Sequence, residues 1–137
     1  MDSAEHIRRF LAGAPFAVAG ASVDRGKYGN KVLRAYLARG LEVFPVNPNA
    51  EEVEGQRAYA RLADLPRRPH GVSIVTPPEI SETIAGEAID LGVPWLWFQP
   101  GAEHRAAIER AEAAGTGVLA FGPCILVALR FRENAGD

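Results

Sequence analysis

Short apolar segments alternate with longer segments of helical periodicity along most of this chain. The apolar segments, which we expect to form β-strands, are residues 16–19, 41–46, 71–75, 95–98 and 117–121. Amphipathic segments predict helices at residues 3–12, 30–39, 79–91, 102–114 and about 123–130. The last of these contains CILVALRF, which could also be a strand. Pro45 cannot donate to a ladder, so we expect strand pairing to weaken there.

Alternating strands and helices with short connections predict an α/β fold, with a parallel sheet covered by helices on both faces. We expect one domain over residues 1–137, a Rossmann-like doubly wound sheet of five strands in the order 3-2-1-4-5. Ligands bind such sheets beyond the carboxyl ends of the strands, at the switch point between the first and fourth strands. The segments that follow predicted strands and should converge there are Gly20-Ala21-Ser22, Asn47-Pro48, Thr76-Pro77-Pro78 and Gln99-Pro100-Gly101.

A glycine-containing loop follows the first predicted strand and leads into a helix that begins at Asn30 and stops at Gly40. The unpaired N–H groups and the dipole of a helix N-terminus attract anions. Three basic residues near this loop outnumber its one acid, Asp24, and we expect them to supply positive charge for several phosphates: Arg25, Lys27 and Lys31. The sequence therefore predicts a phosphate-binding loop, in which a side chain at Gly20 would obstruct a close-lying pyrophosphate. The alternative is an ordinary tight turn between strand and helix.

This loop matches no standard nucleotide-binding motif. It contains no GxGxxG, it is one residue longer than a Walker A loop, and Tyr28 occupies the place of the Ser or Thr that binds Mg²⁺ there. An NAD site also needs an acid after the second strand, and this chain has Asn47 at that position. Thr76 offers a hydroxyl, and Pro77-Pro78 could be a wall for adenine or simply a strand terminator.

Composition narrows the class of protein. The chain has 137 residues, 47% of them hydrophobic, and a net charge of −2, which indicates a globular protein without the basic excess of a nucleic-acid binder. Its single cysteine, Cys124, excludes an internal disulfide and fits the reducing cytoplasm. The three histidines lack zinc-site spacing, no apolar run is long enough to span a membrane, and the first residues do not resemble a signal peptide.

No set of residues typical of catalysis stands out. There is no Ser/His/Asp set or carboxylate pair, and Ser22 is better read as a donor to phosphate than as a nucleophile. Cys124 lies in the first turn of the last predicted helix, where a helix N-terminus lowers the pKa of a thiol. The alternative for Cys124 is a small, buried apolar residue.

Five segments in order, GAS, KYGNKV, VFPVNPN, VTPPE and WFQPGA, give the chain a resemblance to a known family. From about Phe10 to Cys124 it resembles the CoA-binding protein family, which is related to the N-terminal CoA-binding domain of the succinyl-CoA synthetase alpha subunit. The synthetase works through a phosphorylated histidine in a second domain, for which we expect no counterpart here. The resemblance implies that phosphates are held by Gly20, Ala21, Ser22, Lys27, Tyr28, Gly29 and Asn30. It implies that the nucleotide and the pantetheine arm are lined by Asn47, Pro48, Thr76, Pro77, Pro78, Gln99, Pro100 and Gly101.

We therefore expect a small cytoplasmic protein that binds CoA or acyl-CoA and has no catalytic machinery of its own. One alternative is an NAD(P)-linked oxidoreductase on the same fold, and another is the CoA-binding partner subunit of an acyl-CoA ligase. The expected partners are CoA or acyl-CoA and, in the second alternative, a ligase protein, with no nucleic acid and no membrane.

Overall fold

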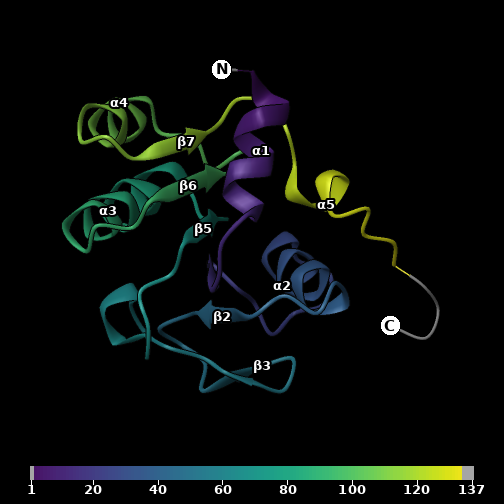
Figure 1. Cartoon of the computed structure of the whole chain (residues 1–137). Coiled ribbons are helices and arrows are strands. Elements are labelled where there is room, and N and C mark those ends of the chain that lie inside the picture. The colour runs from purple at the N-terminus through teal and green to yellow at the C-terminus, as the bar shows by residue number, and fades with distance from the viewer. Residues whose placement is uncertain (1, 134–137) are drawn as a thin grey trace.

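A computed structural model describes residues 2–133 of the chain and shows a central sheet covered by helices on both faces (Figure 1). Five parallel strands form the sheet: β1 (Phe16–Ala19), β2 (Val43–Val46), β5 (Gly71–Ile74), β6 (Trp95–Phe98) and β7 (Gly117–Leu119). The α-helices are α1 (Ser3–Leu11), α2 (Tyr28–Ala38), α3 (Pro78–Asp90), α4 (Arg105–Ala113) and α5 (Ile125–Ala128). The predicted Rossmann-like α/β sheet of five parallel strands is confirmed.

The predicted strand order was wrong. The observed order is β2-β1-β5-β6-β7, so the third strand of the sheet lies beside the first and not beyond the second. After β1 the chain returns through α2 on one face of the sheet, and after β2 it crosses back by a connection without an α-helix. The 3₁₀ turn η1 (Leu62–Asp64) in that connection packs on the opposite face, where Leu62 joins the core beneath α3. The switch point therefore lies between β1 and β5.

Side chains of the strands alternate between two cores, as the period of a β-strand requires. Ala17 and Ala19 of β1 belong to the core under α3 and α4, whereas Phe16 and Val18 belong to the core under α1, α2 and α5. The first core contains many alanines beside larger side chains such as Phe98, and the second contains most of the aromatic residues, among them Trp97, which is fully buried. Because the strands are parallel and packed between these two cores, their carboxyl ends all lie along the same edge of the sheet.

The second strand keeps its pairing through Pro45, contrary to the expected weakening, and Val18 and Pro45 are partners in the ladder. The carbonyl oxygen of Pro45 faces away from β1 and accepts a hydrogen bond from the backbone N–H of Tyr59 at 3.0 Å. Because N–H and C=O of one strand residue point to the same side, the N–H that proline lacks would not have joined the β1–β2 ladder.

Residues 50–69, which lie between the predicted strands 41–46 and 71–75 and hold no predicted strand or helix, contain a small hairpin of β3 (Glu52–Val53) and β4 (Gln56–Arg57). Its turn residues Glu54 and Gly55 both have positive φ, 49° and 77°, as a tight hairpin turn of the primed type requires. Two-residue strands are too short to show an alternating pattern, so the sequence did not reveal them.

Several helix boundaries differ from the expected ones by a few residues. Asp2 caps α1 by accepting a hydrogen bond from the N–H of Glu5 at 2.9 Å, and the helix ends at Leu11, one residue before the predicted end. The second helix begins at Tyr28, two residues before Asn30. The segment CILVALRF contains the short helix α5 and no strand. None of the helices within residues 2–133 has the length and apolar character needed to cross a bilayer.

Candidate functional site at the carboxyl ends of the strands

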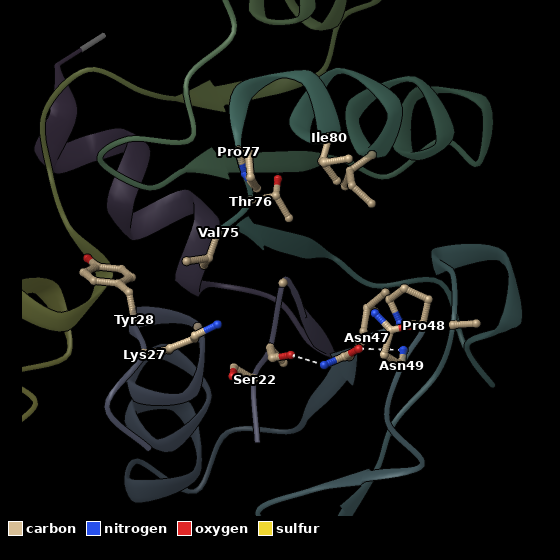
Figure 2. A pocket seen from close by; sticks show the side chains of 16 residues that line it. Ser22, Lys27, Tyr28, Asn47, Pro48, Asn49, Val75, Thr76, Pro77 and Ile80 are labelled. Carbon is tan, nitrogen blue, oxygen red and sulfur yellow. Dashed lines mark hydrogen bonds between the residues drawn. The ribbon is translucent and has the colours of Figure 1, made fainter. Parts of the chain in front are cut away.

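A cavity of about 630 Å³ opens beyond the carboxyl ends of β1, β2 and β5, at the switch point of the sheet (Figure 2). Lys27 and Tyr28 lie at one side of it, Asn47 and Pro48 lie opposite, and Thr76 lies beside Pro77 near the start of α3. Ten of the residues predicted for the site line this cavity, namely Gly20, Ala21, Ser22, Lys27, Tyr28, Gly29, Asn47, Pro48, Thr76 and Pro77. The predicted convergence of segments that follow the strands is therefore observed for three of the four segments.

Gly20 and Gly29 allow the loop after β1 to pack closely against carbonyl groups of the protein's own backbone. Gly20 has φ +96°, and a Cβ atom built on it would lie 2.1 Å from the carbonyl oxygen of Val75. A Cβ atom on Gly29 would lie 2.0 Å from the carbonyl oxygen of Gly20. The sequence suggested that Gly20 makes room for a pyrophosphate, but the structure shows that contacts within the protein already require glycine there.

Asn30 and Arg34 hold the loop after β1 in place by hydrogen bonds to its backbone, and neither residue lines the cavity. The amide nitrogen of Asn30 donates to the carbonyl oxygen of Ser22 at 2.8 Å, and its amide oxygen accepts from Nε of Arg34 at 2.7 Å. Arg34 also donates to the carbonyl oxygen of Arg25 at 3.1 Å, and only 7% of its surface is exposed. The apolar positions of this helix, Val32, Leu33, Tyr36 and Leu37, predict that Arg34 points to solvent, and its burial shows that prediction to be wrong.

The three basic residues predicted to meet phosphates have different surroundings. Arg25 forms an ion pair with Glu54 at 3.5 Å, and Lys31 forms one with Glu133 at 3.4 Å. The hydrogen bond from Arg34, together with Lys31, holds the pKa of Glu133 below its usual range despite the opposing effect of desolvation. Of the described residues that line the cavity, only Lys27 carries a charge.

The N-terminus of α2 also opens on this cavity. Lys27 is its N-cap residue and makes no side-chain cap hydrogen bond, and the first turn contains no acidic residue. Tyr28 and Gly29, the first two residues of the helix, belong to the cavity wall. A helix N-terminus with a neighbouring cation and without a local acid favours an anion.

Asn47, at the end of β2, joins two loops of the cavity. Its amide nitrogen donates to the carbonyl oxygen of Ala21 at 2.8 Å, and its amide oxygen accepts from the N–H of Asn49 at 2.7 Å, as the dashed lines in Figure 2 show. The Thr76 hydroxyl lies 2.8 Å from that of Ser81. These polar groups already have partners within the protein, so their first role is to hold the wall in shape.

A smaller hollow of about 280 Å³ continues the site beyond Tyr28. It shares Tyr28, Thr76 and Pro77 with the main cavity and adds the predicted residues Pro100 and Gly101. Pro77 thus stands in the walls of both hollows as well as ending the strand segment, whereas Pro78 starts α3 and lies in neither. The predicted residues outside both walls are Arg25, Asn30, Lys31, Pro78 and Gln99.

Gln99 is fully buried behind the smaller hollow. Its side-chain oxygen accepts from the N–H of Ile125 at 2.9 Å and lies 3.4 Å from the Tyr28 hydroxyl. The Tyr28 hydroxyl also forms a hydrogen bond with Cys124. Burial of the phenol, and then the contact with Cys124, raise the pKa of Tyr28 well above its usual value of 10.0, so the hydroxyl stays protonated.

Comparison with known proteins identifies this arrangement. Residues 15–130 match the sequence model of the family described as the CoA binding domain. The chain belongs to the CoA-binding domain family. The resemblance drawn from the five segments of sequence is confirmed.

Relatives of this CoA-binding domain include small proteins and part of a large enzyme. A conserved hypothetical protein from Pyrococcus furiosus has a structure with a TM-score of 0.79 and 40% sequence identity, and the match covers 85% of this chain and 99% of that one. The uncharacterized protein YneT of Bacillus subtilis (strain 168) is 28% identical over 112 residues, 82% of each chain. Acetate–CoA ligase [ADP-forming] II of Archaeoglobus fulgidus is 28% identical over 119 residues, which cover 78% of this chain but only 17% of the ligase.

The sequence missed several cavity residues of this CoA-binding domain. They are Val46, Asn49, Ala60, Val75, Ile80 and Ile84. Ile80 and Ile84 lie one turn apart on the helix predicted at residues 79–91, and such spacing is typical of a buried face, but 46% of Ile80 is exposed. An apolar residue left exposed in the first turn of a helix after a strand end could have indicated a ligand wall. Ala60 had no comparable signal, because the bridge between Tyr59 and Val46 carries it to the site.

Proposed function

We propose that this protein binds CoA or acyl-CoA in the cavity at the switch point of its sheet. The observation that carries the proposal is the N-terminus of α2, which opens without a side-chain cap onto a cavity that Lys27 borders. Membership of the CoA-binding domain family supports the choice of ligand. Six of the residues predicted to hold phosphates line the cavity, namely Gly20, Ala21, Ser22, Lys27, Tyr28 and Gly29, and their backbone N–H groups and the Lys27 charge suit the most highly charged part of the ligand.

We assign the remaining parts of the ligand by the chemistry of the walls. The apolar surface of Pro48, Ile80 and Ile84 suits an adenine ring, and no carboxylate stands among the described residues of the wall to favour the free ribose hydroxyls of NAD. The hollow that Tyr28 shares with Pro100 and Gly101 suits the less polar pantetheine arm.

We propose binding without turnover. Among the described residues that line the cavity there is no carboxylate or imidazole that could act as a general base. The Ser22 hydroxyl accepts a hydrogen bond from the N–H of Asp24 at 3.1 Å, and its own hydrogen is left to donate to a phosphate. These features fit a ligand carrier better than an acyl-transfer enzyme.

Isothermal titration tests this proposal. CoA and acetyl-CoA should give saturable heat, and NAD⁺ should give much less. At about a hundred times its dissociation constant, a ligand should stabilise the fold by roughly 2.7 kcal/mol in a thermal-shift assay. Equal affinity for NAD⁺ and CoA would instead favour the oxidoreductase alternative.

A second candidate function is the CoA-binding partner of an acyl-CoA ligase. The ligase relative favours it, because there a segment like this one forms 17% of a longer chain. Affinity purification from the native host tests this candidate. A stoichiometric partner able to bind a nucleoside triphosphate would support it, and recovery of the protein without such a partner would contradict it.

A further inference from the structure

The strand β7 forms one edge of the sheet, and within residues 2–133 no further strand pairs with it (Figure 1). The N–H of Gly117 donates to the carbonyl oxygen of Pro94 at 2.9 Å, so the backbone groups of Gly117 face β6. Because successive residues of a strand direct their backbone groups to opposite sides, the N–H and C=O of Val118 face away from the sheet. Neither group has a hydrogen-bond partner among the described residues.

A hollow of about 300 Å³ lies beside this edge, between β7 and α4. It is lined by Val118 and Ala120 and by charged residues of α4. The Arg105 guanidinium lies over the ring of Phe121, 4.9 Å from its centre, just beyond the carboxyl end of the strand. Glu112 lies near the other end, because the turn from α4 leads directly into β7. The hollow therefore carries a positive charge near one end of the strand and a negative charge near the other.

The two ends of β7 also differ in shape. Phe121 has φ +57°, in the left-handed region that bulky side chains rarely adopt, and 56% of the residue is exposed. At the opposite end, a Cβ atom built on Gly115 would have no atom within 4 Å, so there is open space beside it. An exposed aromatic ring at one end and open space at the other complement each other between two copies that run in opposite directions.

We propose that β7 pairs antiparallel with β7 of a second copy of this chain, which joins the two sheets into one. With a two-fold axis at Val118, each copy donates the Val118 N–H to the Val118 carbonyl oxygen of the other. The same register places Phe121 of each copy opposite Gly115 of the other, because the two residues are equally far from Val118 along the chain. This surface is separate from the proposed CoA site, and the inference does not depend on that site.

The charges on α4 favour a second copy over an unrelated strand as the occupant. The two-fold axis sets the two α4 helices in opposite directions, so Arg105 of each copy faces Glu112 of the other. Glu109, which lies between them on the same side of the helix, faces its own counterpart and limits the affinity. Since the paired strands are short, we expect a weak dimer, with a dissociation constant on the order of micromolar.

The proposed assembly is closed at two chains. Each copy uses its only β7 edge in the contact, and a two-fold interface leaves no second surface of the same kind for a third copy. The other edge of the sheet is bonded to Tyr59.

Sedimentation equilibrium of the whole chain, from low micromolar to submillimolar concentration, tests the proposal. The wild type should show a reversible equilibrium between monomer and dimer. Val118→Pro should stay monomeric over this range and still fold, because the N–H that it removes faces away from β6, and Pro45 already sits in a paired edge strand. A monomeric wild type would leave this edge to a strand of another protein and overturn the proposal, as would a Val118→Pro variant that dimerises normally.

Charge reversal on α4 tests the register, and it keeps the proposal testable if Val118→Pro fails to fold. Arg105→Glu and Glu112→Arg should each weaken self-association about 10-fold, because each brings like charges together at both symmetric contacts. An equimolar mixture of the two variants should associate more tightly than either alone, since every contact between the different chains again joins an arginine to a glutamate. A mixture that associates no better than its components would overturn the proposed pairing.

Arg110→Glu is the matched control for these variants. It makes the same change of charge on the same helix, but the Arg110 guanidinium lies beside Gly86 of α3 and outside the hollow. We expect its self-association to equal that of the wild type. If Arg110→Glu weakens the dimer as much as Arg105→Glu does, the copies respond only to net charge and the proposed contact is wrong. Titration with CoA is a separate measurement, so each of these outcomes leaves the proposed function intact.

Discussion

Replacing Lys27 with alanine should weaken the binding of CoA without affecting the fold. Lys27 lies at the cavity and at the N-cap of α2, and no acid in the first helical turn offsets its charge. A hydrogen bond to a charged group contributes about 1.5–3 kcal/mol, which corresponds to between about 10-fold and 140-fold in affinity. Because the Lys27 side chain is exposed before binding, solvent screening places the expected loss near the lower end, about 1.5 kcal/mol.

Lys31→Ala is the matched control for this experiment. Lys31 carries the same charge one helical turn further on, but it pairs with Glu133 and lies outside the cavity wall. Titration calorimetry at two ionic strengths should show a large loss and a weaker salt dependence for Lys27→Ala and little change for Lys31→Ala. If the two variants lose affinity equally, Lys27 acts only through the long-range potential and the assignment of a phosphate contact is wrong.

Dephospho-CoA, which lacks the 3′-phosphate, refines the same measurement. If Lys27 contacts the 3′-phosphate, the variant and the wild type should bind dephospho-CoA with nearly equal affinity. If it contacts the pyrophosphate, both ligands should lose affinity by the same factor.

Three further predictions concern the scaffold. Gly20→Ala should fold poorly or melt at a much lower temperature, as differential scanning calorimetry can show, because its Cβ would collide with the carbonyl oxygen of Val75 at positive φ; a normal melting temperature would contradict the described loop. Asn30→Ala should destabilise the protein by about 1–3 kcal/mol in urea, since it leaves the Nε of the buried Arg34 without its acceptor; an unchanged urea midpoint would argue against that network. Burial raises the pKa of Tyr36 above 10.0, so above pH 10.0 the folded state keeps a proton that the unfolded chain releases. The free energy of unfolding should therefore fall by about 1.4 kcal/mol per pH unit in that range. Tyr36→Phe should reduce this slope in alkaline denaturation. An unaltered slope in Tyr36→Phe would refute that cause.

Local pattern was enough to predict the strands and helices but not the order of the strands. Apolar runs and changes of period depend on neighbouring residues, and all five strands of the main sheet lie where these signals placed them. Strand order depends on how the chain crosses between strands. The segment from β2 to β5 forms a hairpin and a 3₁₀ turn without an α-helix, and it returns the chain to β1 in a way that no local signal reveals.

In the candidate site, too, the positions of residues could be predicted from the sequence but the contacts between distant residues could not. The residues after each strand were predicted to converge, because the carboxyl ends of parallel strands meet at one edge of the sheet whatever their order. The partners of the charged residues were not predictable, since Arg34 meets Glu133 from 99 positions away and Arg25 meets a turn of the hairpin. A charged residue on a helix normally lies at the surface. Arg34 is buried because the Asn30 amide and the Glu133 carboxylate accept hydrogen bonds from it.

The hydrogen bonds at the outer edge of β2 bear on whether the protein aggregates when it is concentrated. An unpaired edge strand is a template on which a second chain can add a strand and start aggregation. At this edge the Pro45 carbonyl accepts from the N–H of Tyr59, and the Asn47 N–H donates to the carbonyl of Tyr59 at 2.8 Å. Proline itself presents no donor there, so an incoming strand finds neither a free N–H nor a free C=O at these positions. The residue that looks least suited to a strand thus helps to keep this edge from recruiting another molecule.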